Sequence, residues 1–350
     1  MMIDLFSDTK SKPTAAMREA IARAEVGDEQ KFEDPTTNRL RERVCELLGK
    51  EDAVFLPSGT MCNEIAIAVH CRPGDEVIAE AGSHIINYEG GGPAALAGAM
   101  LRGIVAPSGG VPGTFDGAAV RAAVRAESRY FPVSRLMAVE QTANTAGGRV
   151  WPLPLLREVC ATAHGLGLAT HMDGARLMNA VVASGVPARV QATGFDSVWI
   201  DFSKGLGCPV GAMLAGSREF IAQAWRLKQR WGGAMRQSGM LAAAALHALD
   251  HHVERLAEDH ANARLLAVSL AEMPGIAIDP ATVETNLVFF DVAGTGLPAA
   301  RLVGELAARG VQMGAFGDTT IRAVTHLDVH RTDILRAVDA LRDAIASCET

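Results

Sequence analysis

The sequence predicts an α/β protein, in which a large domain with a mostly parallel sheet covered by helices precedes a smaller C-terminal α+β domain. Strand-like apolar runs and helical runs alternate from about residue 50 to residue 230, as in a parallel sheet with helices on both faces. After Gly239 the order changes to one long helical stretch followed by separate strands and helices, which indicates a second unit. We expect the large domain, including an N-terminal arm, at residues 1–247 and the small domain at residues 248–350.

The large domain is expected to begin its regular structure with a helix over 36–48, because Leu40, Val44 and Leu48 recur at helical spacing and Gly49 follows as a stop. Short apolar runs bounded by turn residues predict the strands. Further helices are expected at 61–69, 116–126 and 155–164, and strands at 53–56, 75–80, 135–140 and 167–173. In the small domain we expect one long helix over 240–273, strands at 283–292 and 319–325, and helices at 298–309 and 332–347.

The composition favours a soluble cytoplasmic protein with a large core. Hydrophobic residues make up 49% of the 350 residues, and a formal net charge of -7 argues against a nucleic-acid or anionic-membrane surface. The amino terminus is too acidic for a secretory signal, and no stretch of about 18 apolar residues could span a bilayer. Without C-x-x-C pairs or metal-ligand spacing, the cysteines are expected to be reduced and mostly buried, and no metal is expected. They are Cys45, Cys62, Cys71, Cys160, Cys208 and Cys348.

The stretch from Asp196 to Gly207 presents a single lysine at the edge of the sheet. Val198, Ile200 and Phe202 alternate with smaller or polar residues, which predicts a strand that leads directly to Lys204. A lysine in partly apolar surroundings has its charged form disfavoured, and a neutral amine can attack a carbonyl. The alternative is a solvated lysine at a strand end, since isolated lysines are mostly surface residues.

Two further features lie where open α/β sheets bind ligands. Ser58-Gly59-Thr60 precedes a helix whose free N–H groups and dipole suit a phosphate, although the same residues could form an ordinary N-cap with Thr60 as the cap. Asp173 ends the strand A-T-H-M-D, and an acid leaving a hydrophobic strand needs a cationic partner. That partner could simply be Arg176.

A third feature, the segment 83–92, contains His84, Tyr88 and Glu89 and ends in three consecutive glycines. Glycines in a row indicate a backbone that must bend sharply or approach another group closely. The sequence does not identify that group.

A lysine, a carboxylate and a phosphate-binding helix end match the requirements of pyridoxal 5'-phosphate. The lysine attaches the cofactor covalently, the carboxylate keeps the pyridine nitrogen protonated, and the helix end binds the phosphate. A nucleotide fits less well, because the chain has no G-x-x-x-x-G-K-[ST] motif and no G-x-G-x-x-G after its first strand.

Longer motifs run through nearly the whole chain. They are S-D-T (7–9), K-P-T (12–14), V-G-D (26–28), E-D-P-T (33–36), F-L-P-S-G-T-M (55–61), H-x-x-x-Y-E (84–89), H-M-D-G-A-R (171–176), S-K-G-L-G (203–207), G-G-A-M-R-Q (232–237) and I-R-A-V-T-H (321–326). Through these motifs the chain resembles the threonine aldolase branch of the β-eliminating lyase family, within the fold-type-I pyridoxal-phosphate enzymes.

The resemblance implies a role for each matching residue. Lys204 would carry the cofactor, Asp173 would face its pyridine nitrogen, and His84 would stack on its ring. The residues expected to contact the cofactor are Ser58, Gly59, Thr60, His84, Asp173, Arg176, Lys204 and, from a neighbouring subunit, Arg236. The substrate carboxylate would be held by Ser7, Arg176 and Arg322, since a planar guanidinium can make two parallel hydrogen bonds to one carboxylate. Alternatively, each arginine is a surface charge or an interdomain ion pair.

The sequence departs from the family pattern at three places. It reads E-Q-T-A-N where many members read E-N-T-H-N, so Ala143 stands where a histidine often lies near the substrate hydroxyl. Lys31-Phe32 replaces an aromatic-glycine pair, and Phe6 stands where an arginine is common. These changes could affect the substrate side of the site and leave the cofactor side intact.

The resemblance implies an enzyme that cleaves the Cα–Cβ bond of L-threonine or L-allo-threonine type β-hydroxy-α-amino acids to glycine and an aldehyde. With Ala143 in the histidine position, His84 or an ordered water is the expected base. A β-eliminating lyase, an aldolase for a bulkier β-hydroxy amino acid, and a catalytically silent binding partner remain as alternatives. The family builds its active sites across a dimer, so we expect a homo-oligomer, most simply a tetramer.

Overall fold

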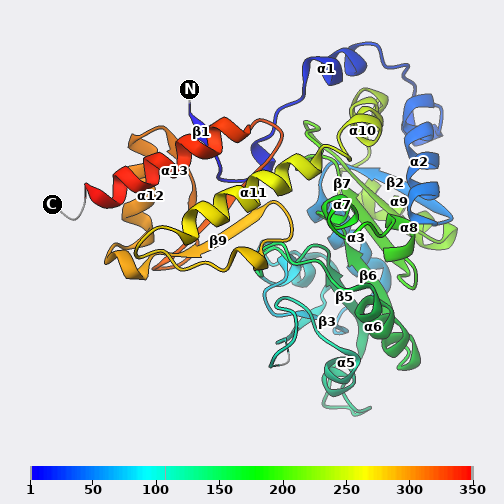
Figure 1. The fold of residues 1–350 in the computed structure, drawn as a ribbon. Helices are drawn as coiled ribbons and strands as arrows, with labels where there is room; N and C mark the ends of the chain where they lie inside the picture. Colours follow the sequence, from blue (N-terminus) through cyan, green and yellow to red (C-terminus); the bar gives the residue numbers. More distant parts are fainter. Residues whose placement is uncertain (1, 107, 348–350) are drawn as a thin grey trace.

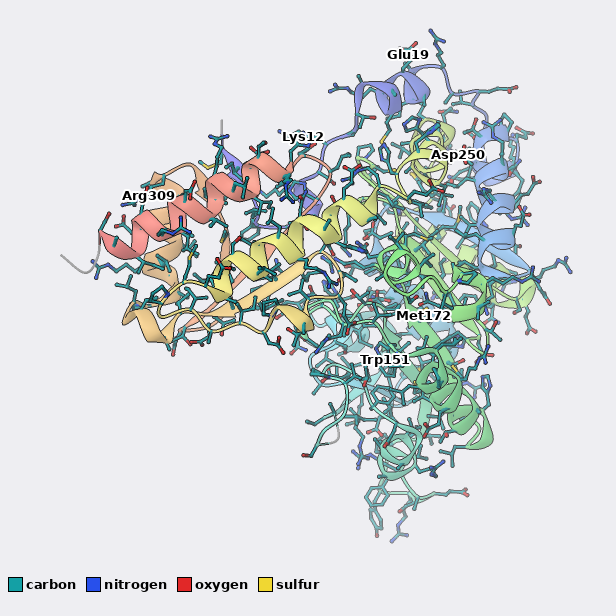
Figure 2. All side chains as sticks on the ribbon, viewed as in Figure 1. Lys12, Glu19, Trp151, Met172, Asp250 and Arg309 are labelled. Carbon is teal, nitrogen blue, oxygen red and sulfur yellow. The ribbon has the colours of Figure 1, made fainter. Side chains whose placement is uncertain are left out.

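The computed structural model describes residues 2–106 and 108–347. Figure 1 shows a body built around a central sheet, from the blue to the green elements, and beside it a second group of elements coloured yellow to red. Side chains such as Trp151 and Met172 lie inside the sheet body, whereas Glu19 projects at its periphery and Arg309 lies on the second group of elements (Figure 2). Among the described residues, no helix combines the length and apolar character that crossing a membrane requires.

The central sheet has seven strands in the order β2-β8-β7-β6-β5-β3-β4. Strand β8 runs antiparallel to both of its neighbours, and the remaining pairs are parallel, so the predicted mostly parallel sheet is confirmed. The strands are β2 (Asp52–Leu56), β3 (Glu76–Glu80), β4 (Met100–Ile104), β5 (Ser134–Glu140), β6 (Ala169–Asp173), β7 (Ser197–Asp201) and β8 (Ala212–Gly216).

Helices cover both faces of this sheet because successive side chains of a strand point to opposite faces. In β7, Val198 and Ile200 enter the larger core, and Trp199 enters the core on the other face. The helices around the sheet are α1 (Ala15–Ala22), α2 (Pro35–Leu48), α3 (Gly59–His70), α4 (His84–Asn87), α5 (Gly117–Ala123), α6 (Leu153–Gly165), α7 (Leu177–Ser184), α8 (Ala188–Gln191), α9 (Arg218–Arg230) and α10 (Gly239–His251).

Local sequence explains where these helices begin and end. The Asp34 carboxylate accepts the Thr37 N–H at 2.8 Å at the start of α2, and Gly49 ends that helix in the left-handed conformation. Helix α3 is capped by Ser58, whose Oγ accepts the Met61 N–H at 3.2 Å. The prediction of Thr60 as the cap was therefore wrong, because Ser58 has the extended backbone and Thr60 is already inside the helix.

The single long helix expected over 240–273 was also wrong. Helix α10 ends at His251, and a separate helix, α11 (Leu256–Ala271), follows after a change of direction visible in Figure 1. At the break, the ring of buried His252 is hydrogen-bonded to the carbonyl oxygen of Leu206 at 2.7 Å. Helix α10 packs on α1 and α2, whereas α11 packs on α7 and α13.

The C-terminal elements form a three-stranded antiparallel sheet under helices, which agrees with the expected α+β character, although the antiparallel pairing and the third strand were not predicted. They are β9 (Leu287–Asp291), α12 (Ala299–Ala308), β10 (Val311–Gln312), β11 (Gly314–Ala315), β12 (Thr320–Val324) and α13 (Arg331–Ala346). Their core is separate from that of the large sheet and takes in Ile3 and Leu5 from the N-terminal segment. That segment contributes β1 (Ile3–Asp4), which pairs in parallel with β10. The boundary at residue 247 stays a prediction.

The described cysteines are free thiols, as predicted from their spacing. Cys62, Cys71, Cys160 and Cys208 are buried and Cys45 is half-buried, while Cys348 lies outside the described residues. No group of three or more histidine, cysteine or acidic side chains among the described residues is arranged to hold a metal ion.

Candidate active site

A cavity of about 460 Å³ lies where β5, β6 and β7 end, facing the first turn of α3. The N-terminal segment reaches it through Ser7 and Thr9, and the C-terminal unit reaches it through Phe316 and Arg322. All of the predicted site residues except Arg236 line this cavity. They are Ser7, Ser58, Gly59, Thr60, His84, Asp173, Arg176, Lys204 and Arg322.

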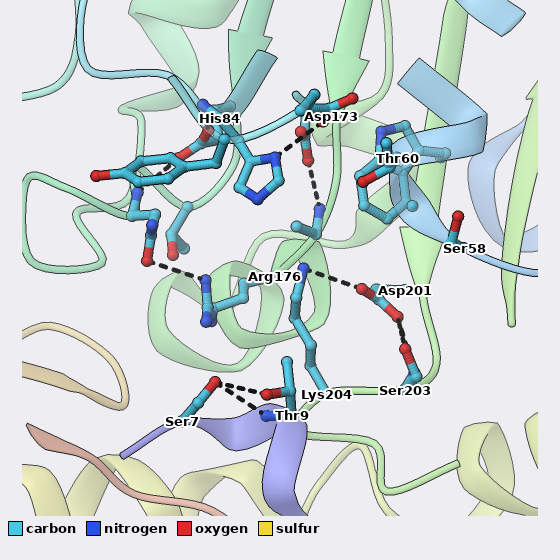
Figure 3. Close-up of a pocket in the computed structure, with 18 of the residues that line it drawn as sticks. Ser7, Thr9, Ser58, Thr60, His84, Asp173, Arg176, Asp201, Ser203 and Lys204 are labelled. Atoms are coloured by element: carbon cyan, nitrogen blue, oxygen red, sulfur yellow. Dashed lines mark hydrogen bonds and ion pairs between the residues drawn. The ribbon is translucent and has the colours of Figure 1, made fainter. Parts of the chain in front are cut away.

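Lys204 points into the cavity just beyond the end of β7 and pairs with an acid from that strand (Figure 3). Its Nζ lies 2.9 Å from Oδ2 of Asp201, whose Oδ1 accepts the N–H and O–H of Ser203, both at 2.8 Å. Burial disfavours the charged amine, but the carboxylates of Asp201 and Asp173 outweigh burial and raise the pKa of Lys204. The expectation of a disfavoured charged form is therefore wrong for the free amine.

Asp173 shares this cavity with Lys204 and is almost fully buried. Its Oδ2 accepts an N–H of Asn63 at 2.8 Å and its Oδ1 accepts the Ala175 N–H at 3.0 Å. Burial raises the pKa of Asp173, although the charge of Lys204 and the Asn63 hydrogen bond oppose that rise. The alternative that Asp173 pairs with Arg176 was wrong, because Arg176 binds another acid.

Asn63 on α3 is the centre of the buried hydrogen-bond network behind the cavity. Its side-chain nitrogen donates to Asp173 and, at 2.7 Å, to Oε1 of Glu89. Its oxygen lies 2.7 Å from Nε1 of Trp199 and 3.1 Å from Nε2 of His171, so both of these nitrogens act as donors. Asn63 thereby uses all four of its hydrogen-bonding positions.

Arg176 forms a buried bidentate pair with Asp8 of the N-terminal segment. Nε lies 2.7 Å from Oδ2 and Nη2 lies 2.8 Å from Oδ1, and Asn286 also donates to Oδ2 at 3.1 Å. Burial alone would raise the pKa of Asp8, but the charge and hydrogen bonds of Arg176 lower it below its usual range. Arg176 keeps both N–H groups of Nη1 and one of Nη2 for other contacts, and its Nη1 lies 3.5 Å from Oδ1 of Asn144.

Arg322 on β12 has no acidic partner among the described residues. Nη2 donates to the Phe6 carbonyl at 3.2 Å, the guanidinium lies over the Phe316 ring at 4.5 Å, and Nε is buried without a hydrogen bond. Burial and the neighbouring charge of Arg176 lower the pKa of Arg322. Because Asp8 neutralises only one of the two guanidinium groups of Arg176 and Arg322, the space between these two side chains favours the binding of an anion.

The first turn of α3 presents its unpaired backbone N–H groups to the same cavity. A side chain at Gly59 would overlap the indole of Trp199, so the close approach that requires a glycine here is made by that ring. The glycine therefore has a packing reason that the sequence did not reveal. The helix N-terminus remains available to a negatively charged group.

His84 begins α4 and is held at two points. Its Nδ1 lies 2.8 Å from Oε1 of Glu89, and its backbone N–H donates to Oε2 of Glu140 at 2.6 Å. Burial lowers the pKa of His84, but the hydrogen bond to Glu89 and nearby carboxylates raise it overall. Glu140 is itself buried, and burial with the charge of Asp173 raises the pKa of its carboxyl to about 7.

Two residues singled out in the sequence are not among those that line the cavity. Ala143 is 5% exposed, and a Cβ at Gly113 would lie only 2.6 Å from its methyl group, so position 143 packs under that loop. Arg236 is mostly exposed and pairs with Asp28 at 2.9 Å. A contact of Arg236 with a phosphate in a neighbouring subunit stays a prediction.

Sequence reasoning missed the acids and the amide that support the predicted residues. Asp201 could have been found, because it ends the buried strand three residues before Lys204. Asn63 and Glu64 also carry a signal, since they are polar residues in an otherwise apolar stretch of α3. Asp8 carries none, because only the three-dimensional path of the N-terminal segment brings it to Arg176.

The comparisons with known proteins agree with this geometry. Residues 4–293 match the beta-eliminating lyase family. The chain is 39% identical to low-specificity L-threonine aldolase 1 of Arabidopsis thaliana, covering 99% of this chain and 97% of that protein. It is 40% identical to the low specificity L-threonine aldolase of Escherichia coli K12, covering 95% and 96% of the two chains.

Solved structures share the fold at lower identity. A threonine aldolase from Leishmania major superposes with a TM-score of 0.81 at 21% identity, covering 98% of this chain and 99% of that one. A putative L-allo-threonine aldolase from Listeria monocytogenes gives a TM-score of 0.78 at 20% identity, covering 98% and 96%. The expected fold-type-I architecture is confirmed by these likenesses. From the match over most of its length and these relatives, the chain belongs to the beta-eliminating lyase family.

Proposed function

We propose that the protein is a pyridoxal 5'-phosphate-dependent aldolase that cleaves L-threonine or L-allo-threonine type β-hydroxy-α-amino acids to glycine and an aldehyde. The observation that carries the proposal is the presence of Lys204, Asp173 and the α3 N-terminus around one cavity, with an unneutralised arginine at its far side. The names of the relatives from Arabidopsis and Escherichia coli support the same reaction.

The residues present fit this cofactor. Unpaired N–H groups of α3 suit its phosphate, and buried Asp173 suits a protonated ring nitrogen. The lone Oγ of Thr142, buried in the cavity wall without a partner, is a further polar atom that a ligand could satisfy. When bound, pyridoxal phosphate supplies an electron sink for the bond that breaks at the amino acid's α-carbon. Lys204 is the residue that would hold it covalently.

The substrate carboxylate would bind between Arg322 and the free edge of Arg176. Arg322 offers the buried Nε without a partner, and Asp8 fixes the plane of the Arg176 guanidinium. The Ser7 oxygen already accepts from the N–H and the hydroxyl of Thr9, which leaves its own proton free to donate to the carboxylate. This grip would orient the amino acid with its side chain toward His84 and Tyr88.

Proton transfer would be shared by Lys204 and the His84 side of the cavity. Asp201 stabilises the charged amine of Lys204, so this amine would hold a proton that it could give to the α-carbon of the substrate. The base for the β-hydroxyl is His84 or a water that it positions. Ala143 cannot act as that base, because a methyl group cannot accept a proton, and its side chain packs against Gly113.

The assembly and setting belong to the same proposal. We infer a homo-oligomer in which Arg236 of one subunit reaches the cofactor phosphate of another, which the exposure of Arg236 supports. A tetramer of two such dimers is the assembly that we propose. The free thiols of the described cysteines support a cytoplasmic setting, where thiols stay reduced.

A substrate panel tests the reaction. Purified protein with pyridoxal phosphate would be incubated with threonine, allo-threonine and phenylserine of both hands at Cα, and glycine, acetaldehyde, 2-oxobutanoate and ammonia would be measured. We expect glycine and acetaldehyde from the L-isomers of threonine or allo-threonine. 2-Oxobutanoate or ammonia without glycine would point to β-elimination, and glycine from phenylserine alone would point to a bulkier substrate. No product from any compound would remove the proposal.

A further inference from the structure

Two buried glutamates lie together behind the cavity with too few hydrogen-bond donors. Glu64 on α3 is 3% exposed, and neither of its carboxyl oxygens has a partner. Glu89 uses Oε1 for His84 and Asn63, but its Oε2 is also buried without a partner. If both carboxyl groups were ionised, these three buried acceptor oxygens without donors would cost several kcal/mol. One of the two carboxyl groups is therefore expected to carry a proton.

We propose that Glu64 is a neutral carboxylic acid that donates its proton to Oε2 of Glu89 and so keeps Glu89 a fixed anionic acceptor for His84. A single proton shared in this way gives a hydrogen-bond partner to one carboxyl oxygen of Glu64 and to Oε2 of Glu89. Glu64 is thus a positioning residue that acts on His84 through Glu89. Only the benefit to catalysis rests on the function proposed above, because the proton itself belongs to the protein.

The three consecutive glycines provide independent support from packing. Gly90 and Gly91 have positive φ angles of 61° and 75°, which a tight turn requires. Gly92 has an ordinary φ of -51°, so its backbone does not need a glycine. A side chain there would instead overlap the Glu64 carboxyl group. The group that this backbone approaches is therefore the carboxyl of Glu64, which is enclosed against the segment that carries His84 and Glu89.

The surrounding charges agree with a protonated Glu64. Burial and then the charge of Glu89 raise the pKa of Glu64 to about 8. Among the described residues no cation opposes this rise, and Lys228 of α9, a helix that packs on α3, is paired with Glu29 at 2.7 Å. The titratable groups that interact with Glu89 are Glu64, His84, Cys62 and Asp173, and its Oε1 lies 2.8 Å from Nδ1 of His84.

The proposal predicts a change at His84 when Glu64 loses its proton. Above about pH 8 two adjacent anions would repel each other, and Glu89 would no longer be held against Nδ1 of His84. A single ionisation near pH 8 leaves about one tenth of the molecules in the competent form at pH 9. Glu64→Gln keeps a donor toward Glu89 and cannot ionise, whereas Glu64→Met has a similar length and no donor.

The test follows the His84 ring by NMR in the full chain labelled with [13Cε1]histidine, with and without pyridoxal phosphate. The signal of His84 is identified by its loss in His84→Asn. We expect a wild-type transition near pH 8 that disappears in Glu64→Gln, and a displaced His84 signal at neutral pH in Glu64→Met. A transition that persists in Glu64→Gln would overturn the proposal, and this comparison decides the matter even if Glu64→Met does not fold.

Two further measurements separate positioning from a merely structural role. Activity profiles, each normalised to its own value at pH 7, should fall about tenfold by pH 9 in the wild type and less than about twofold in Glu64→Gln. The folded protein keeps the Glu64 proton that the unfolded chain releases above pH 4.5. Stability is therefore lost as pH rises from 4.5 to 8, and the Tm of Glu64→Gln relative to wild type should rise across that window. Equal pH dependence of the wild type and Glu64→Gln in both measurements would contradict the protonation of Glu64. If every variant were inactive but the NMR transition were still lost in Glu64→Gln, only the proposed function would be contradicted.

Discussion

Replacement of Asn63 by alanine tests the buried network at its centre. The side chain makes two hydrogen bonds to the carboxylates of Asp173 and Glu89 and two to the ring nitrogens of Trp199 and His171. Alanine would remove one hydrogen bond from each of these four buried partners, and Oε1 of Glu89 would keep only its contact with His84.

The magnitude follows from those contacts. A hydrogen bond to a charged group contributes about 2 kcal/mol and a neutral one about 1 kcal/mol, which gives an upper value of about 6 kcal/mol for four. Because the adjacent cavity can admit water to the stranded groups, we expect about half of that value, roughly 3 kcal/mol. For a chain of this length, this loss corresponds to a decrease in Tm of roughly 4 °C.

A matched control distinguishes the network from simple truncation. Asn262 on α11 is also buried, but its side chain makes one hydrogen bond, to the Val329 carbonyl at 3.1 Å. Asn262→Ala removes the same atoms and should cost only about 1 kcal/mol. Urea unfolding and thermal unfolding of both variants at pH 7 would compare them. If Asn63→Ala destabilised the protein no more than Asn262→Ala, the reasoning about this network would be refuted.

Other substitutions test the cavity itself. Lys204→Ala should prevent the borohydride-reducible attachment of pyridoxal phosphate and lower activity by about a thousandfold or more, and normal turnover would contradict its role. Arg322→Lys should raise KM for threonine about thirtyfold, because the loss of bidentate geometry removes about 2 kcal/mol of binding free energy from the substrate carboxylate. The affinity for pyridoxal phosphate should stay the same. An unchanged KM would place the substrate carboxylate elsewhere. Asp201→Asn removes a charge that raises the pKa of Lys204, so the pH midpoint of cofactor attachment, followed by absorbance, should move down, and an upward shift would show that the ion pair has another role.

Much of the sheet could be predicted because its strands have strong local signals. The strands that end at Glu140 and Asp173, and the strand before Lys204, are short apolar runs between turn residues, and each was found within a residue or two of its observed bounds. Strands β4 and β8 were missed for opposite reasons. The run M-L-R-G-I of β4 lies on an exposed edge and contains a glycine, and A-M-L-A-G of β8 is too uniform to show a period.

The site could be predicted as far as the residues that would touch a ligand, and no further. Lys204 and Asp173 stand at strand ends, which is a local property of the sequence. The partners that set their charge come from distant segments, as Asn63 of α3 does for Asp173 and Asp8 does for Arg176. The pKa of Lys204 was misjudged for this reason, because burial alone lowers it and only the fold reveals the acids around it.

The pairing of β1 with β10 has a consequence for the order in which the protein can mature. Asp4, whose carbonyl oxygen accepts a hydrogen bond from His326 across 322 residues of chain, leaves the ribosome long before its partners exist. Ser7 and Asp8 follow Asp4 directly in the chain, so we expect this part of the cavity to form only when translation is almost finished. A nascent chain that has already formed its large sheet would therefore still lack the contact of Asp8 with Arg176. We expect the ability to bind an amino acid to appear only late in synthesis.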